Sequence, residues 1–457
     1  MGERKRAEAA AALGRWTEPE EVLAQGRALR SQVDHAAHRA MSLAADRPSV
    51  VDYVEASNEG RLPDLVPLRI GRMLASPFSF FRGSAGLMAG DLAAGVASGL
   101  DAQLCGDAHA ANFGLYGTPE GTIVMDINDF DETFPGPWEW DLKRLATSLV
   151  LAGREGGVSE KGCRDAAEDA VHAYREAAVH LAGLPFLESW SALGDESVLS
   201  KSKAQDLTDE FSKAASKARK NTSAKVAAKW TRREGEHWRF VADPPVLTRI
   251  PDETARGVVD ALPSYVDTLR ESRYNLIMRY GVSDVAFRVV GTGSVGLRNY
   301  LVLLHGNGDE ALVLQVKEAR PSALAPFLGT SEHKHEGKRI VHGARLVQAE
   351  SDILLGWTTI EDRHFIVRQF RNRKGEIDAT TLKRDDLDDY GRLAGALLAR
   401  AHSRSVDPRL LAGYCADGED LDTAIGRYAL DYADRTEADH AELAKAVKDG
   451  RLPAHVE

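Results

Sequence analysis

The sequence predicts an α+β protein with two lobes, in which a small antiparallel β-lobe is inserted between largely helical segments. Residues 285–371 hold five apolar strand-like runs separated by turn signals, with one helix among them. Helical apolar spacing marks the flanking chain, as in 141–153, 161–182 and 386–405. At 457 residues the chain is also too long for one ordinary core, which indicates more than one lobe.

These patterns divide the chain into five parts. They are an N-terminal helical segment (1–60), a part with two acidic loops (61–150), a helical extension and connection (151–284), the β-lobe (285–375) and a C-terminal helical part (376–457). Residues 200–233 are rich in Lys, Ala and Ser, so we expect a solvated helix or a mobile connection there.

Composition excludes several classes of protein. A formal net charge of −11 argues against general nucleic-acid binding and favours a cationic or neutral small partner. The three cysteines are far apart and form no disulfide framework or CxxC metal site, which fits a reducing cytosol. We find no secretory signal and no apolar run long enough to span a membrane. We therefore expect a cytoplasmic protein with no membrane partner.

Residues 104–146 gather acid/base and metal-type side chains into a short stretch. A tight loop carries Asp107, His109 and Asn112. The apolar run 122–127 then brings three aspartates close together, namely Asp126, Asp129 and Asp131. Carboxylates this close repel one another unless a cation or protons compensate their charge. The stretch therefore predicts a cation site or a catalytic acid/base group.

A glycine turn precedes a lysine-bearing strand in the β-lobe. Its candidate ligand-binding residues are Gly291, Gly293, Ser294 and Gly296. In a dinucleotide-binding fold this turn would open a helix, but here a second strand, 300–304, follows. A glycine hairpin followed by a strand lysine, Lys317, is the arrangement that covers and contacts nucleotide phosphates in kinase-type folds.

The motif GDAHAAN resembles the catalytic loop of aminoglycoside phosphotransferases, in which an Asp precedes an Asn by five residues, as Asp107 precedes Asn112. The resemblance implies that Asp107 accepts the proton of a substrate hydroxyl and that Asn112 holds magnesium. In that family a strand and a second metal-binding Asp follow. Asp126 and Asp129 both fit this position, and the sequence leaves the choice open. His109 matches a position that is often His and supports the loop.

Further residues take roles from the same resemblance. WDLKRLA resembles the segment whose Asp, here Asp141, braces the catalytic loop, while Cys105 replaces the usual His before Gly-Asp. Kinase folds pair the strand lysine with a helical Glu, for which Glu336 fits best. Arg82, among the aromatic residues of FSFFRGSA, is expected either to bind an anionic group or to pair with the acidic stretch.

The order of the two motif sets is reversed relative to a kinase, because the glycine turn and Lys317 follow Asp107 instead of preceding it. This order implies a protein-kinase-like two-lobed fold in circularly permuted form. The chain also resembles an uncharacterised bacterial family of permuted kinase-like proteins, recognised by FFRGSA, GDAHxxNFG, DINDFDE and WDLKRLA.

The resemblance implies an ATP- and Mg²⁺-dependent phosphotransferase that acts on a hydroxyl of a small molecule, or less favourably of a protein. One alternative is a non-catalytic nucleotide-binding protein of the pseudokinase type, and another is a nucleotidyl transferase. A metal-dependent phosphohydrolase is disfavoured, because GDAH is not followed by the Gly-Asn-His and later histidines that such a site needs.

Overall fold

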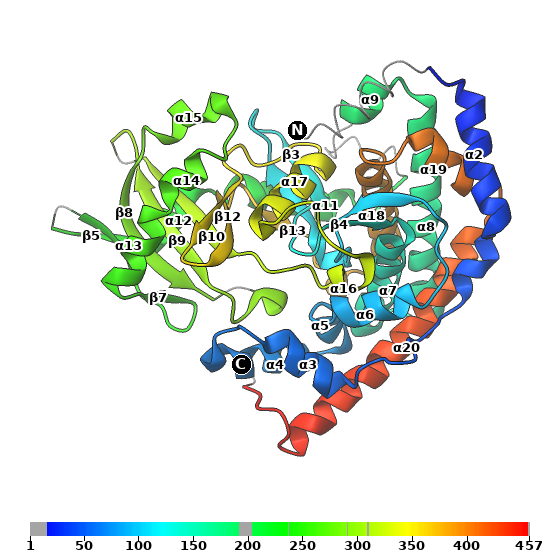
Figure 1. Ribbon diagram of the computed structural model, residues 1–457, viewed down its shortest axis with the longest axis horizontal. Helices are drawn as coiled ribbons and strands as arrows, with labels where there is room; N and C mark the ends of the chain where they lie inside the picture. Colours follow the sequence, from blue (N-terminus) through cyan, green and yellow to red (C-terminus); the bar gives the residue numbers. More distant parts are fainter. Residues whose placement is uncertain (1–15, 192–202, 236, 290, 309, 456–457) are drawn as a thin grey trace.

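The computed structural model describes residues 16–191, 203–235, 237–289, 291–308 and 310–455 (Figure 1). A sheet region lies at one end of the molecule and a helical region at the other, and both contain antiparallel strands. Helices and antiparallel strands together confirm the α+β class. No helix in the described ranges has the length and apolarity needed to cross a membrane.

Six antiparallel strands build the main sheet. Their order is β11 (Gly356–Ile360), β12 (Arg363–Gln369), β10 (Ala311–Glu318), β9 (Asn299–His305), β8 (Gly281–Arg288) and β7 (Leu247–Arg249). The five strands expected within 285–371 are present, although β8 begins a few residues earlier. The sixth, β7, is a three-residue strand at the sheet edge and is too short to produce a sequence pattern.

Both faces of this sheet are covered, which explains the almost continuous apolar runs of its central strands. Val302, Leu314 and Val316 pack on one face with the helices α13 (Asp252–Asp260), α14 (Leu262–Val266) and α15 (Glu271–Ile277) nearby. Leu301, Leu303 and Val313 pack on the other face, toward α12 (Ser223–Trp230). Side chains alternate along a strand, so Gln315 and Lys317 share the second face with Val313.

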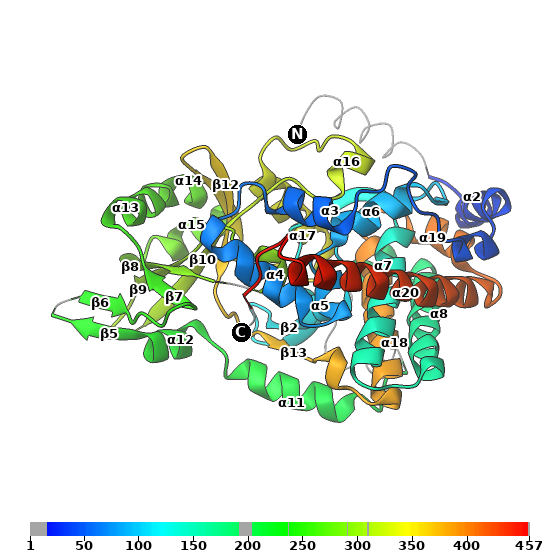
Figure 2. The ribbon, with the colours of Figure 1, turned by 90° about the horizontal axis from the view of Figure 1, so that it is seen from below.

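The helical region is built around long packed helices (Figures 1 and 2). They are α7 (Glu139–Glu155), α8 (Glu160–Gly183), α18 (Arg384–His402), α19 (Pro408–Cys415) and α20 (Asp420–Lys448). The N-terminal helices α2 (Pro19–Gln32), α3 (Val50–Asn58), α4 (Val66–Leu74), α5 (Pro77–Phe81) and α6 (Ala85–Ala93) lie against this group. The apolar periodicity of 141–153, 161–182 and 386–405 therefore predicts α7, α8 and α18 correctly.

Short strands within the helical region carry the two acidic loops. They are β1 (Asp101–Leu104), β2 (Phe113–Gly117), β3 (Ile123–Ile127), β4 (Phe134–Pro137) and β13 (Gly375–Glu376). β1 pairs with β4, and β2 lies between β3 and β13. The loop 105–112 therefore joins β1 to β2, and the loop 128–133 joins β3 to β4. The pairing of β1 with β4 and of β2 with β3 therefore fixes the two ends of each loop.

Chain connections bring the sheet region back to these loops. The segment 370–376 follows β12 and adds β13 to the edge of β2. Part of residues 200–233, expected to be solvated or mobile, forms α11 (Thr208–Arg219), which packs on β2 and β13. Phe211, Ala214 and Ala218 are buried there. Figure 2 shows α11 running beneath β13. The helix alternative is the one found, and its lysines are exposed, while Ala and Phe at helical spacing give it an apolar face that packs on these strands.

Candidate functional site

Two adjoining cavities meet at the acidic loops. One, the sheet-side cavity, has a volume of about 480 Å³ and is bounded by β10, β12 and the segment 370–376. The other, the N-terminal cavity, has a volume of about 570 Å³ and is bounded by α3, α4, α6 and residues 318–327. The residues that line both cavities are Arg82, Asp107, Asn112, Asp129, Gly293 and Ser294. Residues from distant parts of the sequence therefore share one hollow.

The loop after β1 is held by a buried carboxylate. Asp141 at the start of α7 accepts hydrogen bonds from the backbone N–H groups of Cys105 (2.7 Å) and Gly106 (3.0 Å). His402 Nε2, from α18, lies 3.3 Å from the same carboxylate. Gly106 has a φ of +82°, and a Cβ there would lie 2.2 Å from the backbone oxygen of Glu132, so only glycine fits. Asp141 thus lies where the resemblance expects the bracing residue.

Cys105, which stands where the resembling family has a histidine, is buried beside this bracing network. Burial raises the pKa of its thiol well above the usual value, and Asp141 acts in the same direction. A thiol in such surroundings stays protonated and inert. His402 approaches Asp141 from α18, which is distant in the sequence. No spacing rule in the sequence could therefore have identified this contact.

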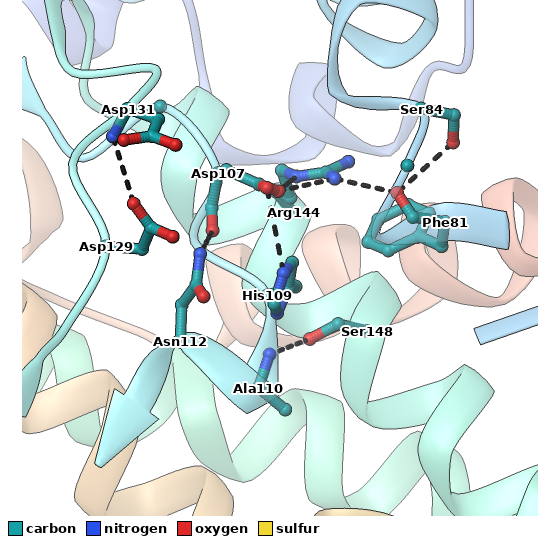
Figure 3. A network of polar contacts seen from close by, with 12 residues as sticks. Phe81, Ser84, Asp107, His109, Ala110, Asn112, Asp129, Asp131, Arg144 and Ser148 are labelled. Atoms are coloured by element: carbon teal, nitrogen blue, oxygen red, sulfur yellow. Dashed lines mark hydrogen bonds and ion pairs between the residues drawn. The ribbon is translucent and has the colours of Figure 1, made fainter. Parts of the chain in front are cut away.

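Asp107 lines both cavities. Figure 3 shows its contacts with Arg144 and Asn112. An Arg144 guanidinium nitrogen lies 2.5 Å from Asp107 Oδ1, and the Asn112 side-chain amide donates to the Asp107 backbone oxygen at 2.7 Å. Burial raises the pKa of Asp107 to about 6, with Arg144 opposing part of that rise. A carboxylate with this pKa is ionised at neutral pH and remains a useful base. Arg144 was missed by the sequence analysis, although it lies three residues after Asp141 on the same helix.

His109 supports the loop from below (Figure 3). Its ring is buried, lies 3.6 Å from Asp107 Oδ2 and packs edge-on against Phe78. Burial lowers its pKa well below the usual value, and the nearby Arg82 and Arg144 lower it further. His109 is therefore neutral at physiological pH and orients Asp107 without adding charge.

The loop after β3 contacts the strand lysine of the sheet region. Lys317 Nζ lies 2.5 Å from Asp131 Oδ2 and 3.5 Å from Asp129 Oδ2. Burial acts against the charge of Lys317, but the two carboxylates outweigh it and raise the lysine pKa. Burial likewise opposes ionisation of Asp129, and Lys317 with Arg368 outweighs it, so the pKa of Asp129 falls below its usual range. Asp129 and Lys317 are thus both charged in the cavity.

Asp126 is not in the cavity. Its carboxylate is completely buried, forms an ion pair with Arg400 of α18, and accepts backbone N–H bonds from Ile127 and Ala349, each at 2.9 Å. All of its acceptor capacity is directed into the protein interior. The expectation that Asp126 serves as a metal ligand is therefore corrected, and Asp129 is the carboxylate of this pair that faces the cavity.

Glu336 also departs from its expected place. It begins α17 (Glu336–Val347), which packs on β11 and β12, and its carboxylate pairs with Arg339 at 2.6 Å. Arg339 in turn donates to the backbone oxygens of Thr133 (2.6 Å) and Asp131 (2.8 Å). Lys317 receives its counterions from the loop after β3 instead of from the helix. The helix contributes indirectly, because Arg339 holds that loop in place.

The glycine turn lies over the shared hollow. Gly291 and Gly293 line the sheet-side cavity, and Ser294 Oγ donates to Asp131 Oδ2 over 3.5 Å. A Cβ at Gly291 would meet nothing within 4 Å, so the fold itself does not demand glycine there. Gly296, with φ +85°, makes the turn and accepts a bond from the Leu62 N–H at 2.8 Å. Open backbone at the first two glycines leaves room for a ligand.

Basic residues dominate the sheet-side cavity. They are Arg82, Lys217, Arg288, Lys317, Arg368, Arg371 and Lys374, against the acidic Asp107, Asp129 and Glu376. Burial and the neighbouring Arg368 lower the pKa of Lys374 to about 7. A cavity in which cationic side chains outnumber carboxylates favours an anionic occupant. The cavity's charge is therefore opposite in sign to the charge of the whole chain.

A divalent cation would find two oxygen donors here. The Asn112 amide nitrogen is engaged with the Asp107 backbone, so its oxygen is the atom with acceptor capacity, and Asp129 supplies a carboxylate. Within the described ranges no group of three or more His, Cys, Asp or Glu side chains could hold a metal by itself. Mg²⁺ is commonly bound by one or two protein oxygens together with substrate phosphates and water, so this pair fits Mg²⁺ held jointly with a ligand.

Residues 61–446 match the family described as "Uncharacterized protein conserved in bacteria" (DUF2252). The chain belongs to this family. The matched span contains both acidic loops, the glycine turn, Lys317 and α18. No curated protein and no solved structure matches the chain significantly. The expected membership in an uncharacterised bacterial family is confirmed.

Proposed function

We propose that this chain is an ATP- and Mg²⁺-dependent phosphotransferase that acts on a hydroxyl group of a small molecule. One observation carries the proposal. Lys317 and the glycine turn line the same cavity as Asp107, Asn112 and Asp129, although about 180 residues of sequence separate the two sets. Two motif sets that meet in this way supply the recurring parts of a phosphoryl-transfer site.

Each part has a chemical task in this proposal. Lys317, the basic lining and the backbone N–H groups of the glycine turn bind the nucleotide phosphates. Asn112 and Asp129 hold Mg²⁺, which neutralises charge on the phosphates. The substrate hydroxyl oxygen forms a bond to the γ-phosphorus as the bond to the β–γ bridging oxygen breaks and ADP leaves. Asp107 receives the hydroxyl proton.

The proposed fold is a kinase-like one in permuted order. The sheet region follows the order of a kinase small lobe. The strand β8 leads through the glycine turn to β9, and the lysine-bearing β10, the helix α17 and the strands β11 and β12 follow. The segment 370–376 then returns to the acidic loops as a connection between lobes would. The departure is at Lys317, whose counterions Asp129 and Asp131 come from the metal-side loop.

A non-catalytic nucleotide-binding protein is the second candidate. The ion pair of Asp107 with Arg144 favours it, because a carboxylate that already binds a guanidinium is a weaker proton acceptor. Nucleotidyl transfer would use the same phosphate-binding groups. The phosphohydrolase alternative loses ground, since no cluster of three or more metal-type side chains occurs in the described part of the chain.

Nucleotide binding can be tested by thermal melting. We expect Mg²⁺-ATP to raise the melting temperature, because a ligand at roughly 100 times its Kd stabilises the folded state by about 2.7 kcal/mol. Lys317→Ala should remove this shift, whereas Lys338→Ala, an exposed lysine on α17, should retain it. Each variant is compared with its own nucleotide-free melting temperature. The absence of a shift in the wild-type protein with any nucleotide would overturn both candidates.

A further inference from the structure

The N-terminal cavity adjoins the acidic loops, and Lys317 does not line it. Asp107, Asn112 and Asp129 line both cavities, but Lys317 lines only the sheet-side one. If the nucleotide phosphates occupy the sheet-side cavity, an acceptor must approach Asp107 from the N-terminal cavity. The lining of that second cavity therefore reports on the chemistry of the acceptor, and this inference rests on the proposed function.

Three arginines that line the N-terminal cavity and not the sheet-side one have no carboxylate partner among the described residues. They are Arg61, Arg69 and Arg320. Among the residues that the structure describes, none of the three has a carboxylate within ion-pair distance. Neutral oxygens hold them instead. Arg61 donates to Val295 O (2.6 Å) and Ser57 O (2.9 Å), and Arg320 donates to Ser57 O (3.4 Å).

Arg69 is the most deeply enclosed of the three. Only 2% of it is exposed, its Nη atoms donate to Asn58 Oδ1 (2.7 Å) and Gly83 O (3.3 Å), and its Nε has no hydrogen-bond partner. Leaving a buried donor without a hydrogen-bond partner destabilises the folded state, and more so when the group is charged. Such a group is retained most readily where a ligand satisfies it.

The arginines also repel one another. Burial lowers the pKa of Arg61 to about 9, with Arg69 and Arg320 adding to the effect. Burial lowers the pKa of Arg69 to about 10, again with a contribution from Arg320. Both remain protonated at neutral pH, so positive charge is concentrated where the three arginines lie, while the whole lining holds five arginines and six carboxylates. An anion placed among the three arginines would relieve this repulsion.

Arg47, which lines the same cavity, differs from these three arginines because it forms ion pairs with carboxylates. Arg47 contacts Asp91 (2.9 Å) and Asp439 (2.6 Å) and is thereby neutralised. Two acidic groups of the cavity have other partners: Glu318 pairs with Arg298 and Arg363, and Glu132 accepts the Ala323 N–H. Glu132 attracts Arg61 over a longer distance, but among the described residues no carboxylate forms an ion pair with any of the three arginines.

We propose that the acceptor is a small hydroxy compound bearing an anionic group, a carboxylate or a phosphate, which Arg61, Arg69 and Arg320 bind while its hydroxyl faces Asp107. Guanidinium groups bind both anions through paired N–H donors. The net charge of −11 favoured a cationic or neutral partner. The cluster of three arginines points to an anionic group instead, because a bound group responds to the side chains that it contacts.

The test uses inorganic phosphate and malate as separate probes, without nucleotide, on the full chain. We expect at least one probe to raise the melting temperature of the wild-type protein and of Lys317→Ala equally. Its apparent affinity should fall about tenfold or more in Arg61→Gln and in Arg320→Gln, which remove half-buried arginines. Arg256→Gln, at an exposed position on α13, is the matched control and should bind as the wild type does.

The outcomes separate the explanations. A response to phosphate alone identifies a phosphate-bearing acceptor, and a response to malate alone identifies a carboxylate-bearing one. No response to either, or a response that survives Arg61→Gln and Arg320→Gln but disappears in Lys317→Ala, would overturn the inference. An anion response in a protein that ignores Mg²⁺-ATP would retain the anion site while refuting the proposed phosphotransferase.

Discussion

Asp107→Asn is expected to lower the rate of phosphoryl transfer by about 10²–10⁴-fold, the usual contribution of a positioned proton acceptor. Nucleotide binding should persist, because Lys317 and the basic lining of the sheet-side cavity are unchanged. The amide retains the shape of the carboxylate and can still accept a bond from Arg144. What it loses is the capacity to take the hydroxyl proton.

The measurement is ADP formation from Mg²⁺-ATP in the presence of a small-molecule extract that supplies the acceptor. Asp101→Asn, at an exposed position at the start of β1, serves as the matched control and should retain the wild-type rate. Normal turnover by Asp107→Asn would refute the role assigned to Asp107. Loss of both binding and turnover would indicate instead that Asp107 maintains the site's structure.

The pH dependence gives the same prediction a second readout. Asp107 must be ionised to accept a proton, and its pKa is raised to about 6 by burial. We therefore expect kcat/KM to fall as the pH decreases through about 6. The acidic limb should be absent from the residual activity of Asp107→Asn. A profile that declines only near the ordinary pKa of an aspartate would contradict this account.

Asp126→Ala is expected to destabilise the protein by about 3–5 kcal/mol, because it leaves the buried Arg400 guanidinium without its counterion. It also removes the acceptor for the N–H groups of Ile127 and Ala349. Asp129→Ala is the matched comparison. Asp131 still pairs with Lys317 in that variant, so its stability should change far less.

Urea denaturation distinguishes the two aspartates. We expect a large decrease in the unfolding midpoint for Asp126→Ala, with nucleotide binding retained in the fraction that folds. Asp129→Ala should unfold close to the wild type but lose the Mg²⁺ dependence of ATP binding. The opposite result, a stable Asp126→Ala whose ATP binding no longer depends on Mg²⁺, would show that Asp126 is the metal-binding carboxylate.

The sequence predicted those features that depend on neighbours along the chain. Apolar runs between turn signals predicted β8 to β12, and the five-residue spacing from Asp107 to Asn112 marked the loop that lines both cavities. Spacing could not separate Asp126 from Asp129. Their environments differ because Asp126 meets Arg400, a residue 274 positions later that only the packing of α18 brings near.

Residues that act through distant partners were missed for the same reason. Arg339 holds the loop after β3, and His402 contacts the bracing Asp141. Asp131 provides the counterion of Lys317 that was expected from Glu336. Glu336 pairs instead with Arg339, one turn further along α17. Helical spacing identifies Glu336 and Arg339 as neighbours. Only the folded chain shows that the carboxylates that pair with Lys317 come from the loop after β3.

The most direct test of the central claim is a calorimetric titration of Mg²⁺-ATP into four proteins. They are the wild type, Lys317→Ala, Asp129→Asn and the double variant. If the two distant parts of the chain form one nucleotide site, each single change should weaken the same binding event by about tenfold or more, and the two effects should not be additive. Unaltered binding by Asp129→Asn, or no binding heat for the wild type, would contradict a shared site.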